Sequence, residues 1–275
     1  MNQNLKTRIL TGIIAGSLFL FLLSFRTGFI VLLTIIGILA LLELASFFRR
    51  AALPMMGVIA VILSNIWALT RSSIYAFKPS EGLLTLDIFA WITVGIYLIS
   101  GLYLLSKGPL KNTMALLMAS IAWPAWSFGL MIMYITREGS HRYAFFVGIL
   151  LLIWASDIAQ YFSGRRWGKH ALASTISPKK TVEGWVGGFV GILLISIVNS
   201  LWISPQQTFF QWLTIGVIVW IFGTVGDLYE SVFKRSVGVK DSGNILPGHG
   251  GILDRFDSLI FAFPFIIVWL SVMKW

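Results

Sequence analysis

The sequence predicts an all-α, polytopic membrane protein, and three observations lead to this fold class. Hydrophobic residues make up 57% of the 275 positions and charged residues only 12%, which is about half the charged share of a soluble domain. The mean hydropathy is +0.85. Apolar stretches of membrane-spanning length recur along the chain, and they are too long for barrel strands. Because lipid leaves unpaired backbone groups without partners, we expect every span to be a helix.

Nine apolar stretches are long enough to cross a bilayer, which takes about 17 to 25 helical residues. The first follows a short basic start but has no small-residue cleavage site, so we expect a retained helix rather than a signal peptide. The spans are predicted near 9–25, 27–47, 52–70, 84–106, 113–135, 143–163, 185–204, 209–226 and 258–274.

The positions of Lys and Arg predict a cytoplasmic N-terminus and an outward C-terminus. In this orientation the cytoplasmic segments hold 15 of the 21 basic residues, as the positive-inside rule requires. Anionic lipid headgroups account for the net charge of +10, so we expect no nucleic-acid partner. The chain has no cysteine, which excludes disulfides and thiolate metal sites.

The polar residues divide the chain into two parts. Residues 157–257 contain 7 of the 11 acidic residues. We therefore expect 1–140 to form a transmembrane scaffold of about five helices and 141–275 to form the catalytic region. Two cytoplasmic loops, 164–184 and 227–257, are predicted to carry the chemistry.

A helix that continues out of the span near 209–226 brings four polar residues onto one face. They lie at offsets of 0, 3, 4 and 7, the spacing of one helical face: Asp227, Glu230, Ser231 and Lys234. Gly223 and Gly226 just before them allow another helix to approach closely. One interpretation is a solvated helix end with an ion pair between Glu230 and Lys234. The other is a binding site, because Asp227 directly follows an apolar run and a carboxylate there needs a cation or a partner.

The stretch LPGHGGILDRFDS, residues 246–258, concentrates charge and glycine before the last span. Its glycines allow a sharp bend that exposes backbone N–H groups to an anion. Asp254 and Asp257 begin a helix, where carboxylates either complement the helix dipole or hold Mg²⁺. Lys240 and Arg255 bracket the loop and suit phosphate. His249 could donate to phosphate, act as a base or cap the turn.

A third group of candidates surrounds the loop 164–184. Asp157 lies inside a span, four residues before Tyr161, and an acid at that depth is a functional hypothesis by default. The basic residues are interpreted either as a site for an anionic headgroup or triphosphate or as membrane anchors: Arg165, Arg166, Lys169, Lys179 and Lys180. Glu43, deep in the second span, either pairs with Arg49 or Arg50 or belongs to the site.

Together these groups indicate a membrane enzyme or transporter that uses Mg²⁺ and phosphate-bearing substrates. An ion-coupled transporter would use Asp157 and Asp227 as cation ligands. Transporters often contain two related halves with broken helices, whereas this chain is asymmetric. The residues therefore favour an enzyme.

Residues 231–257, SVFKRSVGVKDSGNILPGHGGILDRFD, resemble the signature of the bacterial phosphatidate cytidylyltransferase (CDP-diacylglycerol synthase) family. Ser, Lys-Arg, Lys-Asp, His-Gly-Gly and Asp-Arg with a final Asp are all present. The segments GDLYES, SPKKTVEGWVGG and LKTRILTGI are also similar to family segments. The resemblance therefore covers nearly the whole chain.

This resemblance implies a reaction in which phosphatidate attacks the α-phosphate of CTP, giving CDP-diacylglycerol and pyrophosphate. It implies Mg²⁺ on Asp227 and Asp254, with a second, monovalent cation such as K⁺ as an option. The implied catalytic residues are Asp227, Asp254, Lys240, Asp241, Arg255, Asp257 and His249. The implied substrate-binding residues are Ser231, Lys234, Arg235, Asp157, Tyr161, Lys179, Lys180, Gly250 and Gly251.

The resemblance also implies a homodimer in the bacterial inner membrane, with its active site facing the cytoplasm. The chain departs from the family pattern near Asp157, where Ile158 and Gln160 replace small or polar residues. This departure concerns the path of the lipid rather than the reaction. A cytidylyltransferase for isoprenoid lipids, or a polyprenol kinase that uses CTP, remains the nearest alternative.

Overall fold

The computed structural model describes residues 17, 21–22, 25–51, 54–75, 83–107, 120–136, 141–243, 245 and 250–275. The helices in the first half are α2 (Arg26–Arg50), α3 (Met55–Tyr75), α4 (Leu83–Lys107) and α6 (Ala125–Ile135). The second half contains α7 (His141–Trp167), α8 (Val182–Val198), the π-helix η2 (Asn199–Ile203), α9 (Phe209–Ser236) and α10 (Leu253–Met273). Two short strands, β1 (Ala171–Ala173) and β2 (Ser177–Thr181), form an antiparallel hairpin between α7 and α8.

The all-α membrane fold is confirmed. Seven helices in the described ranges are long and apolar enough to cross a membrane, and they match all the predicted spans except the first and fifth. The first span, 9–25, lies almost entirely outside the described residues. The fifth, 113–135, is wrong as one continuous helix, because residues 121–124 form bends and turns before α6. Pro124 ends this turn, since proline has no N–H for the helical ladder.

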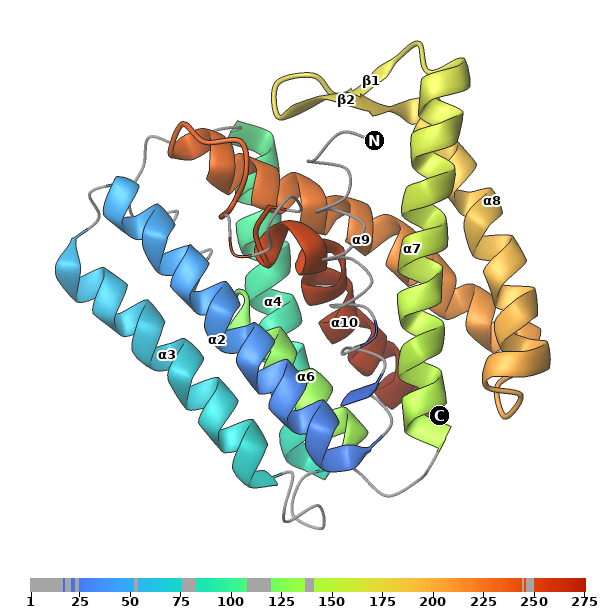
Figure 1. Cartoon of the computed structure of the whole chain (residues 1–275), viewed down its shortest axis with the longest axis horizontal. Helices are drawn as coiled ribbons and strands as arrows, with labels where there is room; N and C mark the ends of the chain where they lie inside the picture. The colour runs from blue at the N-terminus through green and yellow to red at the C-terminus, as the bar shows by residue number, and fades with distance from the viewer. Residues whose placement is uncertain are drawn as a thin grey trace.

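Figure 1 shows two groups of helices joined by α9 and α10. On one side, α2, α3, α4 and α6 form a bundle, and on the other α7 and α8 run side by side. Helix α10 lies between the groups and packs against α4, α6 and α9. The last helix is therefore largely buried by protein, with Ile260, Phe263 and Ile266 fully enclosed.

Glycines bring α7 and α8 into close contact. A Cβ on Gly191 would lie 2.6 Å from the Ala155 carbonyl oxygen, and one on Gly184 would lie 3.0 Å from the Gly164 Cα. The run VEGWVGGFVG therefore presents a nearly smooth face to α7, as small residues do in membrane helix pairs. This contact fixes both helices below the hairpin.

A second close contact joins α9 to α10. A Cβ on Gly226 would lie 2.7 Å from the carbonyl oxygen of Asp257. Gly223 faces Ser258 at 3.5 Å. The predicted close approach of another helix at these two glycines is confirmed, and it places the polar end of α9 beside the first turns of α10.

The hairpin, the C-terminal end of α9 and the start of α10 all lie in the upper part of Figure 1, and the C-terminus lies below. The basic residues at the ends of α2, α7 and α9 belong to this same end of the molecule: Arg49, Arg50, Arg165, Arg166, Lys234 and Arg235. The two polar segments predicted from the sequence therefore share one end of the bundle.

Candidate active site

The β1–β2 hairpin is anchored to the start of α8 by two side chains. Thr181, the N-cap of α8, accepts a hydrogen bond from the Gly184 N–H at 3.1 Å. Glu183 accepts from the N–H groups of Lys169 at 2.9 Å and His170 at 3.2 Å. The His170 Nδ1 lies 2.6 Å from the other Glu183 oxygen. These bonds hold the chain that leads into β1, and so determine where β2 presents its lysines.

A pocket of about 380 Å³ lies below this hairpin, and we call it the hairpin pocket. Four elements contribute to it, namely α7, β2, α8 and α9. Its lining residues are Asp157, Gln160, Tyr161, Gly164, Arg165, Lys179, Lys180, Thr181, Gly184, Trp185 and Asp227. The pocket thus combines carboxylates and cations at one end of an apolar bundle, where an anionic ligand with a metal ion would find both kinds of partner.

Lys180 and Asp227 form an ion pair across the pocket. Their side chains are 23% and 31% exposed, so water reaches both. The other Asp227 oxygen lies 3.4 Å from the Ser231 hydroxyl, a weak contact from the next turn of α9. Asp227 is therefore held by partners that an incoming ligand could replace.

Two further carboxylates interact electrostatically with Asp227. Asp157 and Asp257 lie within electrostatic range of both Asp227 and Lys180. Arg165, Lys179 and Lys180 line the same pocket, so both signs of charge meet there. Carboxylate oxygens are the ligands that Mg²⁺ prefers. Among the described residues, however, no three His, Asp or Glu side chains lie together in a group that could hold a metal ion, so the magnesium ion at Asp227 stays a prediction.

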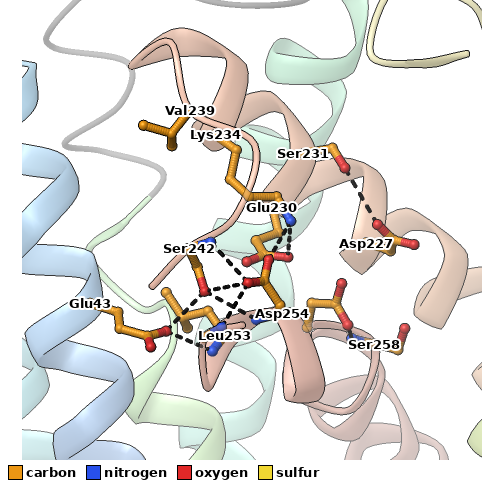
Figure 2. Close-up of polar contacts among 12 residues, drawn as sticks. Glu43, Asp227, Glu230, Ser231, Lys234, Val239, Ser242, Leu253, Asp254 and Ser258 are labelled. Carbon is orange, nitrogen blue, oxygen red and sulfur yellow. Dashed lines mark hydrogen bonds and ion pairs between the residues drawn. The ribbon is translucent and has the colours of Figure 1, made fainter. Parts of the chain in front are cut away.

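A second polar group, the buried ionic cluster, consists of Glu43, Glu230, Lys234, Ser242 and Asp254 (Figure 2). The Lys234 ammonium donates to Glu230 at 2.9 Å and to Asp254 at 2.7 Å. Glu230 is 0% exposed and Lys234 only 10% exposed. The interpretation of a solvated helix end is therefore wrong: the ion pair exists, but α10 and the preceding loop enclose it.

Asp254 has both oxygens engaged in this cluster. Oδ1 accepts from Lys234, whereas Oδ2 accepts from the Ser242 N–H at 2.9 Å and the Gly251 N–H at 3.0 Å. The Ser242 hydroxyl lies 2.9 Å from the same oxygen. Asp254 thus ties the loop 237–252 to α9 and α10, and it contacts a set of residues different from that around Asp227 (Figure 2).

Glu43 reaches this cluster from the first half of the chain. Its carboxylate accepts from the Ser242 hydroxyl at 3.0 Å and from the N–H groups of Ile252 and Leu253 at 2.9 Å each. The predicted pairing with Arg49 or Arg50 is wrong, because both arginines end α2 with exposed side chains. Burial requires the carboxylate to find donors inside the protein.

Gly250 and Gly251 of the signature are each required to be glycine, for different structural reasons. Gly250 has φ +86, in the left-handed region that favours glycine. A Cβ on Gly251 would lie 1.8 Å from the Ser242 hydroxyl oxygen and 2.6 Å from Glu43. Both glycines are therefore needed for the loop to pack against the buried ionic cluster.

The other signature residues lie around this loop. Lys240 and Asp241 are exposed after α9, and Arg255 is exposed in the first turns of α10. Arg235 donates to the Val239 carbonyl at 2.8 Å and so closes the end of α9. His249 lies outside the described residues.

Both predicted loops are shorter than expected. Residues 227–236 extend α9, and 253–257 already belong to α10, so the connection is 237–252. In the other loop, α7 runs to Trp167, the hairpin occupies 171–181 and α8 starts at Val182. The extension of α9 agrees with the predicted helix that continues out of the span, and it contains the Glu230–Lys234 ion pair.

Sequence reasoning missed several residues of these two groups. Ser242 lies inside the signature but is not one of its fixed positions. Glu183 lies in a segment that resembles the family, but no pattern in the sequence indicates its bonds to residues 169 and 170. The pocket residues Thr181, Gly184 and Trp185 were not singled out. Thr181 is a preferred N-cap residue and Glu183 is an acid in the first helical turn, and together they could have indicated where α8 begins.

The fold and the site define a polytopic membrane protein whose carboxylates and cations gather at one end of the bundle. Residues 6–273 match the cytidylyltransferase family, and the chain belongs to that family. It is therefore an enzyme, a nucleotidyltransferase.

The chain is 35% identical to the phosphatidate cytidylyltransferase of Bacillus subtilis, over 98% of this chain and 99% of that protein. It is 34% identical to the proteins of the same name from Staphylococcus haemolyticus and Staphylococcus aureus. These matches cover 98% and 97% of this chain and 100% and 99% of those proteins.

Proposed function

We propose that the chain transfers the cytidylyl group of CTP to phosphatidate, giving CDP-diacylglycerol and pyrophosphate. The observation that carries this proposal is the hairpin pocket, which places Lys179, Lys180 and Arg165 beside Asp227 at the end of a membrane bundle. Relatives that match over nearly their full length bear the name of this activity.

In the proposed reaction a phosphate oxygen of phosphatidate attacks the α-phosphorus of CTP. A new P–O bond forms, the bond from the α-phosphorus to its bridging oxygen breaks, and pyrophosphate leaves with that oxygen. A phosphate monoester is already anionic near pH 7 because its second pKa is about 6. No strong base is required, and the main barrier is the repulsion between two anions.

The cations of the hairpin pocket would reduce this repulsion. Lys180 is held by Asp227, so we propose that it moves from the carboxylate to a phosphate when the nucleotide binds. Lys179 is exposed and Arg165 donates to Tyr161 at 3.3 Å, so both lie at the pocket wall. Each would contribute a charge-assisted hydrogen bond to a phosphate oxygen.

We propose Asp227 as a Mg²⁺ ligand, with Asp157 and Asp257 as two further carboxylates that interact with it electrostatically. The ion would supply charge neutralisation at the phosphates. The Asp254 carboxylate accepts hydrogen bonds from Lys234, Ser242 and Gly251, and we assign it to the loop rather than to the metal. We propose Glu230 as the place for a second, monovalent cation. The support is its buried Oε1, which has no hydrogen-bond partner among the described residues.

We also propose that the hairpin end faces the cytoplasm of the bacterial inner membrane. The basic helix ends gather there, and the positive-inside rule places such ends on the cytoplasmic side. CTP is available on that side only. The homodimer rests on the family resemblance alone.

The test uses the full-length protein in detergent with phosphatidate, Mg²⁺ and CTP labelled in the cytosine. We expect label to move into the lipid fraction and the transfer to stop when EDTA removes the metal. Label that stays soluble, while γ-labelled CTP tags a polyprenol, would show a kinase instead. Transfer to an isoprenoid lipid phosphate but not to phosphatidate would correct the acceptor.

A further inference from the structure

Glu43 joins the first half of the chain to the signature loop and the first turn of α10 through side-chain hydrogen bonds. It lies in α2, and its side chain is almost enclosed, with 4% of the residue exposed. Its three donors are the Ser242 hydroxyl and the N–H groups of Ile252 and Leu253. Helix α2 therefore carries the acceptor that holds the loop against the bundle (Figure 2).

A continuous set of hydrogen bonds leads from Glu43 through the buried ionic cluster to α9. The Ser242 hydroxyl lies 3.0 Å from Glu43 and 2.9 Å from Asp254. Asp254 in turn accepts from Lys234 at 2.7 Å. A change at Glu43 must therefore alter the partners of Ser242 and Asp254, because buried polar groups in one network depend on one another.

The space around Glu43 suits a carboxylate and nothing larger. A Cβ on Gly243 would lie 2.5 Å from Glu43 Oε1, and one on Gly251 would lie 2.6 Å from Oε2. Two glycine backbones thus close over the carboxylate. Since the Ile252 N–H bonds one carboxylate oxygen and the Leu253 N–H bonds the other, an amide at this position would point its NH₂ group at a backbone donor in either orientation.

We propose that Glu43 is a positioning residue of this enzyme, which holds Asp254 and Lys234 in place through Ser242 and the start of α10. Its role in turnover rests on the proposed function, whereas its hold on the loop does not. The rival interpretation is that the carboxylate occupies an anion site at the N-terminus of α10 that a substrate phosphate would take. Its enclosure by protein argues against exchange with a ligand.

Four variants of the full-length protein test this proposal. Glu43→Gln removes the charge at nearly constant volume, and Glu43→Asp restores the charge on a shorter side chain. Leu42→Ala is the matched control, because Leu42 adjoins Glu43 in α2 but is 59% exposed. Ser242→Ala breaks the same network from the loop side, in case Glu43→Gln does not fold.

The first measurement is hydrogen exchange at the amides of Ile252 and Leu253, which requires no substrate. We expect Glu43→Gln to speed this exchange at least roughly tenfold, since a hydrogen bond to a charged group is lost. Exchange in the middle of α10 should stay unchanged, and Leu42→Ala should behave like the wild type. Unchanged exchange at both amides in Glu43→Gln would overturn the proposal.

The second measurement is cytidylyl transfer to phosphatidate with the folded variants. We expect kcat to fall at least roughly tenfold in Glu43→Gln. Glu43→Asp should recover part of this loss. The double variant Glu43→Gln/Ser242→Ala should be no slower than Glu43→Gln alone. A lower KM for CTP in Glu43→Gln would show instead that the carboxylate competes with phosphate. If the wild type transfers nothing, the proposed function fails, and the exchange measurement alone decides the role of Glu43.

Discussion

The hairpin pocket and the buried ionic cluster each contain a lysine bound to an aspartate, but the two pairs have different surroundings. Lys180 and Asp227 keep 23% and 31% of their side chains exposed, whereas Lys234 and Asp254 keep 10% and 11%. Asp227 has one weak further contact, and Asp254 has several strong ones. The first pair can exchange partners with a ligand at modest cost, while the second resembles a buried ion pair that loses much stability when one partner is removed.

This difference assigns different tasks to residues that lie close together in the sequence. Asp227 and Lys234 lie on the same helix, two turns apart, at the same end of the bundle. The accessible pair is suited to ligand binding, and the enclosed pair is suited to holding the loop in place. The following predictions test that division.

The largest effect is expected for Asp227→Asn in the hairpin pocket. The substitution keeps the shape but removes a charge proposed to hold Mg²⁺, so transfer should fall by roughly a hundredfold or more. The fold should survive, because the side chain is partly exposed. The measurement is label transfer at saturating Mg²⁺, alongside gel filtration in detergent. A near-normal rate would remove Asp227 from the metal site.

Lys180→Ala should reduce kcat/KM for CTP by about tenfold, because one charge-assisted bond to phosphate is lost. The variant should also need less Mg²⁺ for half-maximal rate, since Lys180 no longer competes for Asp227. Both values come from one titration of CTP and one of Mg²⁺. Arg166→Ala is the control, because Arg166 is exposed at the end of α7 but does not line the pocket. Unchanged CTP kinetics in Lys180→Ala would contradict the proposed exchange.

Gly251→Ala changes the volume next to the buried ionic cluster without changing any charge, and so tests how tightly the loop packs there. The added methyl group would collide with Ser242 and Glu43, and overpacking of this kind costs about 1–3 kcal/mol. A thermal melt in detergent should show the loss. Gly95→Ala in α4 is the matched control, because no atom lies within 4 Å of the new Cβ. It should leave the melting temperature unchanged or raise it, since alanine favours the helix by about 1 kcal/mol over glycine. Equal melting temperatures for both variants would mean that the loop repacks freely.

The smallest effect is expected for His170→Ala, which removes one contact of the hairpin anchor. His170 is 78% exposed, and an ion pair open to water contributes little to stability. Glu183 keeps its bonds to the N–H groups of residues 169 and 170. We therefore expect KM for CTP to rise no more than about fivefold, with kcat unchanged. A loss as large as that of Lys180→Ala would show that the histidine itself contacts the substrate.

Much of the fold follows from the sequence alone. The spacing of apolar stretches predicts seven of the observed membrane helices, and glycines at 223 and 226 predict the close contact of α9 with another helix. The helical offsets of Asp227, Glu230, Ser231 and Lys234 are also confirmed within α9. These features depend on local backbone hydrogen bonding and on side-chain volume, and short segments of the chain determine both.

Only the tertiary structure separates the polar residues into two groups. The sequence places Asp227 and Asp254 together as carboxylates of one signature, but α9 and α10 present them to different partners. Glu43 stands about two hundred residues before its donors, Ser242 and Leu253, and no local pattern indicates that contact. The apolar length of a helix is determined by its own residues, whereas the partner of a buried charge is determined by which helices pack around it.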